Sequence, residues 1–274
     1  MEQTNLTSCK LRKVVLQLFS AMLACSLTVG YAYGQESAER GLEIAKERKA
    51  RDKGWGDTTA KMSMILRNAS GDEVERKMRM ESLEIQDDGD KALTIFDQPL
   101  DVKGTVFLTF SHALEPDDQW MYLPKLSRVK RIRSKNKSGP FMGSEFSFED
   151  MSSFELEKYE FKYLRDEEYD GQSCFVLEQI PTDENSGYSK QILWVDKVHY
   201  RALKIEFYDR KNSLLKELIN YDYKLYLDKF WRPMRVEVVN KQNGKSTALL
   251  TQELQFKTGL DESDFKQNSM KNRR

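Results

Sequence analysis

The sequence predicts a mainly β protein built on antiparallel strands, and three observations support this. Short segments in which apolar and charged residues alternate recur between residues 57 and 256, which is the period of strands with one buried face. Turns rich in glycine, asparagine and aspartate separate these segments, as in hairpins. No strand–helix–strand alternation is present, which argues against a parallel α/β sheet. A single strongly curved sheet or open barrel of ten or eleven strands fits best, and a two-sheet sandwich fits the strand count almost as well.

The start of the chain has the pattern of a secretory signal peptide. Basic residues occur within positions 10–13, an apolar run follows at 14–30, and small residues precede position 35. The apolar run is shorter than the roughly 20 residues of a membrane-spanning helix. We therefore predict a cleaved leader at residues 1–34 and one folded domain at residues 35–274.

The cysteines bear on this leader and on the redox state of the mature chain. Lipid attachment at Cys25 is an alternative to plain cleavage, but Met22 is a poor residue for that signal. Cleavage leaves Cys174 alone, which excludes an intrachain disulfide in the mature chain. Cys174 lies in a strand-like run, and we expect a buried structural thiol there.

Within the folded domain, the pattern predicts one helix followed by strands. Residues 37–53 predict the helix, with Ser37 as its cap and a thin apolar stripe. A two-stranded hairpin is expected within residues 57–81. Further strands are expected at residues 92–96, 104–110, 156–164, 173–180, 190–196, 202–208, 214–225, 234–240 and 247–256. Residues 261–265 predict one helical turn, and residues 266–274 predict a frayed polar tail.

The central stretch of the chain, residues 118–151, combines a strand-like pattern with a basic run. Residues 120–124 alternate as on a strand, and basic residues follow without an intervening acid. One interpretation is a solvated loop or an edge strand protected by charge, and the other is a patch for an acidic partner or anionic lipid headgroups. The formal net charge of +0 favours the first interpretation and gives no support to a nucleic-acid partner. The candidate partner-binding residues are Lys125, Arg128, Lys130, Arg131 and Arg133.

The sequence offers little support for catalysis. His112 and His199 are widely separated and have no metal-ligand spacing. No nucleotide-binding, nucleophile-elbow, metalloprotease or redox motif occurs. We therefore predict a non-enzymatic protein without catalytic residues, metal or cofactor.

Methionines and aromatic residues are the most informative group for function. From periodicity alone an ordinary core is the favoured interpretation, and the alternative is an adaptable apolar pocket, which flexible methionines suit. Val106 and Phe107 point to opposite faces of their strand, so only one of them can face inward. The candidate cargo-binding residues are Met62, Met64, Leu66, Met78, Met80, Val106, Leu108, Phe110, Trp120, Tyr122, Phe141, Met142, Phe146, Phe148 and Met151.

Three motifs in the central stretch carry a family resemblance. They are Trp120-Met-Tyr-Leu-Pro124, Arg128-Val-Lys-Arg-Ile132 and Phe141-Met-Gly-Ser-Glu-Phe-Ser-Phe-Glu-Asp150. With residues 99–108 upstream and 194–209 downstream, this pattern resembles the outer membrane lipoprotein-sorting proteins of the LolA/LolB-like periplasmic lipid-carrier superfamily. The specific part covers about thirty residues, and the looser part covers most of the folded domain.

The resemblance implies a specific fold and function. It implies an incomplete antiparallel β-barrel with an N-terminal helix and a short lid helix covering the open side. It also implies a monomeric periplasmic carrier that binds acyl chains of lipoproteins or other lipids, contacts membranes transiently and uses no cofactor, and this favours the pocket interpretation of the methionines. The motif further resembles the branch linked with inner-membrane export pumps of the resistance-nodulation-division type. An envelope-stress sensor that uses the same half-barrel is the alternative.

Overall fold

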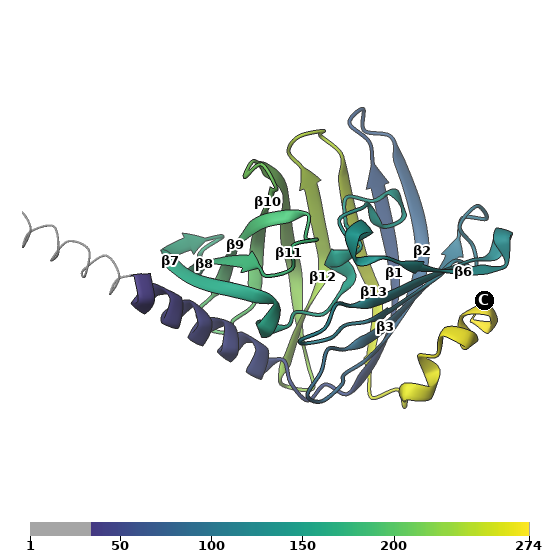
Figure 1. Ribbon diagram of the computed structural model, residues 1–274, viewed down its shortest axis with the longest axis horizontal. Coiled ribbons are helices and arrows are strands. Elements are labelled where there is room, and N and C mark those ends of the chain that lie inside the picture. The colour runs from purple at the N-terminus through teal and green to yellow at the C-terminus, as the bar shows by residue number, and fades with distance from the viewer. Residues whose placement is uncertain (1–33, 274) are drawn as a thin grey trace, which may run out of the picture.

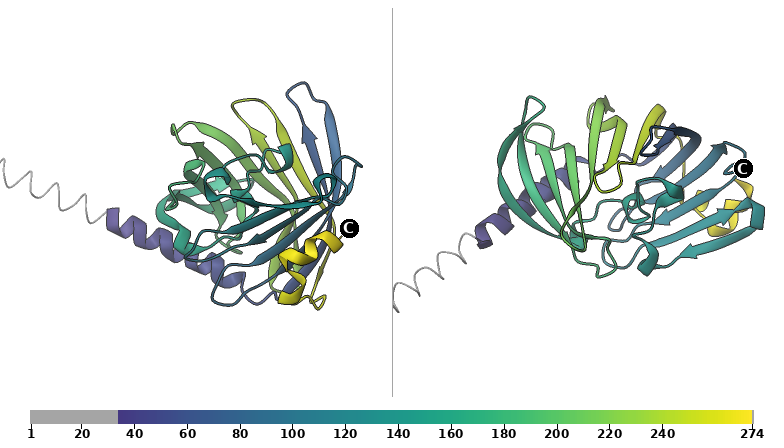
Figure 2. Two further views of the ribbon diagram at one scale, coloured as in Figure 1. Left: turned by 45° about the vertical axis from the view of Figure 1, so that its right-hand side comes forward. Right: turned by 90° about the horizontal axis from the view of Figure 1, so that it is seen from above.

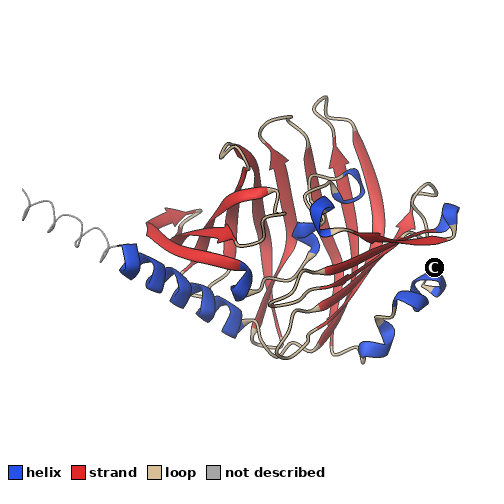
Figure 3. Cartoon of the chain, in the orientation of Figure 1, coloured by secondary structure: helices blue, strands red, loops and turns tan. Residues whose placement is uncertain are grey.

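The computed structural model describes residues 34–273, and these residues form a curved β-sheet with one α-helix of more than two turns. The helix spans residues 34–51, close to the predicted range (Figure 3). All but the last residue of the predicted leader, including Cys25, lies outside the described residues.

The sheet contains 13 antiparallel strands in the order β6-β5-β4-β3-β2-β1-β13-β12-β11-β10-β9-β8-β7. The first six are β1 (Asp57–Arg67), β2 (Glu73–Leu83), β3 (Lys91–Gln98), β4 (Val106–Phe110), β5 (Asp118–Leu123) and β6 (Arg128–Ile132). The others are β7 (Tyr159–Tyr169), β8 (Gln172–Pro181), β9 (Tyr188–Asp196), β10 (Ala202–Asp209), β11 (Leu214–Tyr226), β12 (Phe230–Asn240) and β13 (Ser246–Phe256). The single curved sheet is confirmed over the two-sheet sandwich, and the predicted count of about eleven strands was too low.

The strand order places the two sheet edges next to each other in the sequence. The chain runs outward from β1 to β6 and then back from β7 to β13, which pairs with β1. Strands β6 and β7 do not pair, so the barrel stays open. Residues 133–158, called the crossing segment below, join these edges across the inner face of the sheet (Figure 1). The view from above shows how strongly the sheet curves around this segment (Figure 2).

The crossing segment contains no α-helix, so the predicted lid helix was wrong. It contains four short 3-10 turns: η2 (Ser134–Asn136), η3 (Phe141–Gly143), η4 (Glu149–Met151) and η5 (Leu156–Lys158). In η3, Met142 has φ +52° and Gly143 has φ +74°, both in the left-handed region. A right-handed helix cannot continue through two such residues.

The inner face of the sheet carries an apolar core that the crossing segment covers. Met62 pairs with Met78, Met78 pairs with Phe96, and Phe107 pairs with Met121, so their side chains share this face. Phe141 of the crossing segment is fully buried against them, with its ring centroid 4.9 Å from that of Phe107. Phe107, not Val106, therefore faces inward on β4.

The outer face of the same strands is covered by the C-terminal segment. Leu93, Leu108 and Tyr122 lie in one buried cluster with Phe265 and Met270, which are 1% and 0% exposed. The predicted helical turn is present as η6 (Glu262–Asp264), followed by η7 (Gln267–Asn272). The prediction of a frayed tail was wrong, because Met270 anchors this segment.

The N-terminal helix packs on the inner face near the other edge. Ile44 and Ala45 are buried, and Ile44 lies in one apolar cluster with Leu193 of β9. Leu193 pairs with Ile205 of β10, which pairs with Leu218 of β11, so the helix and the inner core share one face of the sheet. The helix thus occupies the part of the inner face that the crossing segment leaves free.

The closest approach of helix and sheet occurs at Gly41, and it generates a prediction. A Cβ atom at Gly41 would lie 2.7 Å from the backbone nitrogen of Tyr163 and 2.8 Å from that of Lys162. We expect Gly41→Ala to lower the free energy of unfolding by about 1–3 kcal/mol through overpacking, although alanine favours helices. Urea denaturation measures this. Glu43→Ala, at an exposed position of the same helix, is the control, and equal stability of the two variants would contradict the packing.

Candidate functional site

Two cavities open at opposite ends of the strands. The larger, called the helix cavity, has a volume of about 1020 Å³ and lies between the end of the helix, the end of the crossing segment and strands β10–β12. The smaller, called the loop cavity, has a volume of about 470 Å³ and lies between residues 138–147 and the opposite ends of β9–β12. The crossing segment therefore divides the interior of the half-barrel.

The floor of the helix cavity is apolar and continuous with the inner core. Ala202, Ile205 and Leu218 line it from β10 and β11, and Phe154 lines it from the crossing segment. Leu218 also packs against the inner core. Through Leu218, the apolar floor of this cavity is therefore continuous with the inner core beneath the crossing segment.

One end of the helix cavity is cationic and aromatic. Arg48, Arg201 and Arg232 all act electrostatically on the hydroxyl of Tyr223. The Arg201 guanidinium carbon lies 4.8 Å from the ring centroid of Trp231 and 5.0 Å from that of Tyr223. None of these residues was predicted from the sequence as a site residue. A signal existed, because Arg48 follows Gly41, Ile44 and Ala45 at helical spacing and so falls on the buried stripe.

The other end of the helix cavity holds an acidic cluster tied to the helix. Lys49 donates to the Glu155 carboxylate at 2.9 Å and to the Phe154 carbonyl at 2.8 Å. Nearby, burial raises the pKa of Asp90 to about 6, and the charges of Glu155 and Glu84 add to this effect. The Lys49 contacts fix the crossing segment to the helix at the mouth of the cavity.

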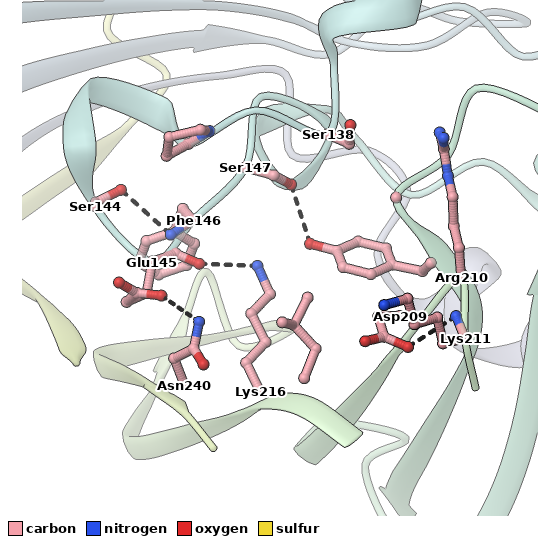
Figure 4. A pocket seen from close by; sticks show the side chains of 14 residues that line it. Ser138, Ser144, Glu145, Phe146, Ser147, Asp209, Arg210, Lys211, Lys216 and Asn240 are labelled. Atoms are coloured by element: carbon pink, nitrogen blue, oxygen red, sulfur yellow. Dashed lines mark hydrogen bonds between the residues drawn. The ribbon is translucent and has the colours of Figure 1, made fainter. Parts of the chain in front are cut away.

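A buried ion pair fixes the crossing segment beside the loop cavity, and Figure 4 shows its lysine, Lys216, reaching Glu145 of the segment. Lys216 Nζ lies 2.5 Å from Asp150 Oδ2, and their side chains are only 4% and 8% exposed. Lys216 also donates to the Glu145 carbonyl at 2.9 Å. Tyr188 donates to Asp150 at 2.8 Å, and its oxygen lies 3.0 Å from the Ser147 hydroxyl. These contacts give Asp150, Ser147 and the Glu145 carbonyl partners on the sheet, as buried polar groups require.

The structure divides the predicted cargo-binding residues between the two faces of the sheet. The inner-face set is Met62, Met64, Leu66, Met78, Phe141, Met142, Phe146, Phe148 and Met151. The outer-face set is Val106, Leu108, Phe110, Trp120 and Tyr122, packed under the C-terminal segment. Met80 belongs to neither cluster. Apart from Phe146 in the loop cavity, none of them lines either cavity, and their binding of cargo stays a prediction.

The predicted partner-binding residues form the exposed edge of the sheet. Arg128, Lys130 and Arg131 lie on edge strand β6, Lys125 and Arg133 flank it, and all five are exposed. Arg131 forms an ion pair with Asp118. The edge-strand interpretation of the basic run is confirmed, and a partner for it stays a prediction.

The two histidines contact different residues. His112 Nδ1 lies 2.8 Å from an oxygen of Asp88, and the ring of His199 lies 4.7 Å from that of Trp231. Among residues 34–273, no group of three or more His, Cys, Asp or Glu side chains is arranged to hold a metal ion. Cys174 is fully buried, as predicted, and burial raises the pKa of its thiol to about 11.

Similar structures define the class of this protein. It resembles a LolA superfamily protein from Nitrosomonas europaea, with 19% identity, a TM-score of 0.64, and coverage of 86% of this chain and 98% of that chain. It resembles a DUF1329 family protein from Desulfovibrio piger, with 27% identity, a TM-score of 0.81, and coverage of 85% and 99%. The protein is thus an open half-barrel with the LolA superfamily fold.

Closer similarity identifies the family. A Vibrio parahaemolyticus domain described as an outer membrane lipoprotein-sorting protein domain is 63% identical, with a TM-score of 0.84 and coverage of 85% of this chain and 99% of that chain. A family model described as "Uncharacterized protein" matches residues 88–272, and no curated protein matches the chain. The chain belongs to the outer membrane lipoprotein-sorting protein family, which confirms the resemblance in its sequence. In the part of the chain that the structure describes, no helix has the length and apolar character needed to cross a membrane.

The buried ion pair at the loop cavity predicts a large effect of its disruption. Lys216→Met leaves the Asp150 carboxylate buried without its cation, and we expect a loss of about 3–5 kcal/mol in the free energy of unfolding. Hydrogen exchange in residues 139–151 should also become faster. Lys211→Met, at an exposed residue of the same cavity, is the control. A loss below about 1 kcal/mol for Lys216→Met would show that the pair does not hold the segment.

The raised pKa of Asp90 predicts a specific pH dependence. Because the folded pKa of about 6 exceeds the unfolded value of 3.8, folding favours protonated Asp90. The associated stability is present below about pH 4 and is lost as the pH rises through about 6. We expect wild type to lose stability relative to Asp90→Asn across this window, as measured by denaturation at each pH. A constant difference between the two proteins would contradict the burial of Asp90.

Proposed function

We propose that the protein is a non-enzymatic periplasmic carrier, which binds acyl chains of lipoproteins or other lipids inside the half-barrel and moves them across the cell envelope. The observation that carries this proposal is the helix cavity, whose volume is about 1020 Å³ and whose apolar floor continues into the inner core. Ligand sites in proteins typically measure roughly 300–1,000 Å³. The family membership and the signal-peptide pattern support the same function.

Burial of an acyl chain supplies enough free energy for a carrier. Each buried methylene contributes about 0.8 kcal/mol, so about ten methylenes contribute roughly 8 kcal/mol, the scale of a micromolar Kd. The floor residues Ile205 and Leu218 give such a chain a starting surface. The contact needs no hydrogen bond and therefore accepts chains of different lengths.

Longer chains would extend beneath the crossing segment. Met62, Met64 and Met78 lie there on the inner face, and methionine side chains adapt to irregular ligands. Phe141 and Phe146 would have to move with the segment to admit a chain. In this proposal the inner-face set of predicted residues contacts cargo only when the crossing segment moves. The outer-face set packs against the C-terminal segment.

The basic edge strand offers a surface for delivery. Arg128, Lys130 and Arg131 project from β6, where cations near an anionic surface contribute about 1 kcal/mol each. We propose that this edge approaches anionic lipid or an acidic face of a membrane transporter during loading or release. We expect such contact to be transient, because attraction between exposed charges is screened by salt.

A substitution in the cavity floor tests the carrier function. Leu218→Asp places a carboxylate on the apolar floor, and we expect the affinity for a fluorescent fatty acid to fall roughly tenfold or more. Fluorescence titration of delipidated protein measures the affinity, and native mass spectrometry of protein purified without detergent identifies the natural cargo.

The matched control is Leu225→Asp, the same change on the same strand at a residue that is 44% exposed and outside the cavity. We expect it to bind like wild type. Circular dichroism verifies that both variants fold. If wild type takes up no lipid, or if the two variants bind equally well, the carrier proposal fails and the sensor alternative gains support.

A further inference from the structure

Resting on the proposed carrier function, we propose that the cationic end of the helix cavity binds the anionic headgroup, a phosphate or a carboxylate, of the amphiphile whose acyl chain lies on the cavity floor. Arg48 is the principal ligand in this proposal. The cavity would then have a cationic end for the headgroup and an apolar end for the chain. Its cargo would be restricted to amphiphiles with an oxyanion.

Arg48 has no direct ion-pair partner among the described residues, although the Asp52 carboxylate acts on it electrostatically. Its guanidinium carbon lies 4.5 Å over the ring of Phe154, and within residues 34–273 its guanidinium makes no hydrogen bond and no ion pair. Burial lowers the pKa of Arg48, which reflects the cost of holding the charge away from bulk water. A guanidinium has five N–H donors in a planar fork that matches carboxylate and phosphate. An anion in the cavity would satisfy these donors and remove this cost.

The neighbouring arginines already have partners. Arg201 donates through Nε to Asp196 at 2.8 Å and through Nη2 to Gln172 at 2.7 Å. Arg232 donates through Nη1 to Asp52 at 2.6 Å. Asp196 and Asp52 therefore offset two of the three guanidinium charges of Arg48, Arg201 and Arg232, which leaves a charge of 3 − 2, or +1, on this set of residues. This excess suits one singly charged headgroup.

The cationic end lies directly beside the apolar floor. Tyr223 and Asn220 both donate to the Ala202 carbonyl at 2.7 Å, and Ala202 itself lines the floor. The Tyr223 oxygen keeps its lone pairs, and the rings of Tyr223 and Trp231 hold Arg201 in place. A headgroup at Arg48 would thus leave its first methylenes against Ala202 and Ile205, as an amphiphile requires.

Asp52, the carboxylate that acts electrostatically on Arg48, accepts a hydrogen bond from Arg232, and other acids of the cavity also have partners of their own. Glu155 is paired with Lys49, and Glu84 accepts from the backbone nitrogens of Gly54 and Gly56. Asp90 accepts from the backbone nitrogen of Ile85 and has a pKa of about 6. The last three of these acids line the end away from Tyr223 and would repel an anion, so the headgroup has one favourable position.

The test compares two probes that differ only in charge. A fluorescent fatty acid and its methyl ester are titrated into delipidated wild type, Arg48→Gln and Arg40→Gln. Arg40 is the matched control, because it lies on the same helix over the ring of Tyr163 at 4.0 Å and does not line the cavity. We expect wild type and Arg40→Gln to bind the acid about tenfold more tightly than the ester. In Arg48→Gln this preference should disappear, while the affinity for the ester should stay unchanged.

The possible results separate the two proposals. If wild type binds neither probe, the carrier function fails. If wild type binds acid and ester equally, or if Arg48→Gln keeps the preference, the carrier function stands and the headgroup site is overturned. Inorganic phosphate alone and a lysophosphatidylglycerol distinguish the sources of the anion. The proposed site predicts tight binding of the lysolipid and at least hundredfold weaker binding of phosphate. Equal binding of the two would assign the site to free phosphate and would overturn the proposal of an amphiphile headgroup.

Discussion

The structure depends on the placement of an irregular segment inside a sheet that does not close. Strands β6 and β7 are the two edges, and residues 133–158 must connect them across the inner face. Irregular backbone inside a protein leaves polar groups that need partners. Long side chains from the sheet and the helix supply them. Lys216 donates to the Glu145 carbonyl, Lys49 to the Phe154 carbonyl and Gln119 to the Phe148 carbonyl.

These polar anchors explain why the half-barrel has cavities. A segment held by apolar contacts alone would settle against the sheet wherever packing is best. The ion pairs of Lys216 and Lys49 instead fix two points of the segment above the inner face. Phe141 and Phe146 of the segment pack into the inner core, and the loop cavity and the helix cavity remain beside the two anchored parts. Buried ion pairs are weak evidence for net stability, but they select one arrangement of a segment that could adopt others.

The sequence reveals the regular parts of this fold and not the irregular ones. Alternation predicted almost every strand because each has one face that must be buried. It could not say which face of β4 turns inward, because both faces are buried and Val106 and Phe107 are equally apolar. Residues 266–274 have the pattern of a polar tail because Met270 is an isolated apolar residue, and Phe265 before it is isolated too. An isolated apolar residue shows no periodic pattern. The local sequence offered no partner for them, since the surface they cover comes from distant strands.

The helix cavity was not predicted from the sequence, for a related reason. The predicted cargo-binding residues are apolar, and the structure places most of them in the buried clusters on the two faces of the sheet. The helix cavity is instead marked by a conflict: Arg48 occupies a position of the helix stripe that packing would assign to an apolar side chain. Local conflicts of this kind cost stability and tend to occur at functional sites. Here the conflict places an unpaired guanidinium in the same cavity as the apolar floor formed by Ile205 and Leu218.

The position of Arg48 beside the apolar floor gives the cavity two chemically different ends. Apolar burial by itself would hold an acyl chain in any orientation and would resist release to the same degree from either end. A single cationic point at the helix end orients the ligand, with its headgroup at Arg48 and its chain toward the crossing segment. The same helix holds that segment through Lys49, one residue further along the chain. A headgroup that binds Arg48 therefore contacts the same helical turn that holds the crossing segment through Lys49. The headgroup would affect the crossing segment through the helix, and the acyl chain would affect it by direct contact.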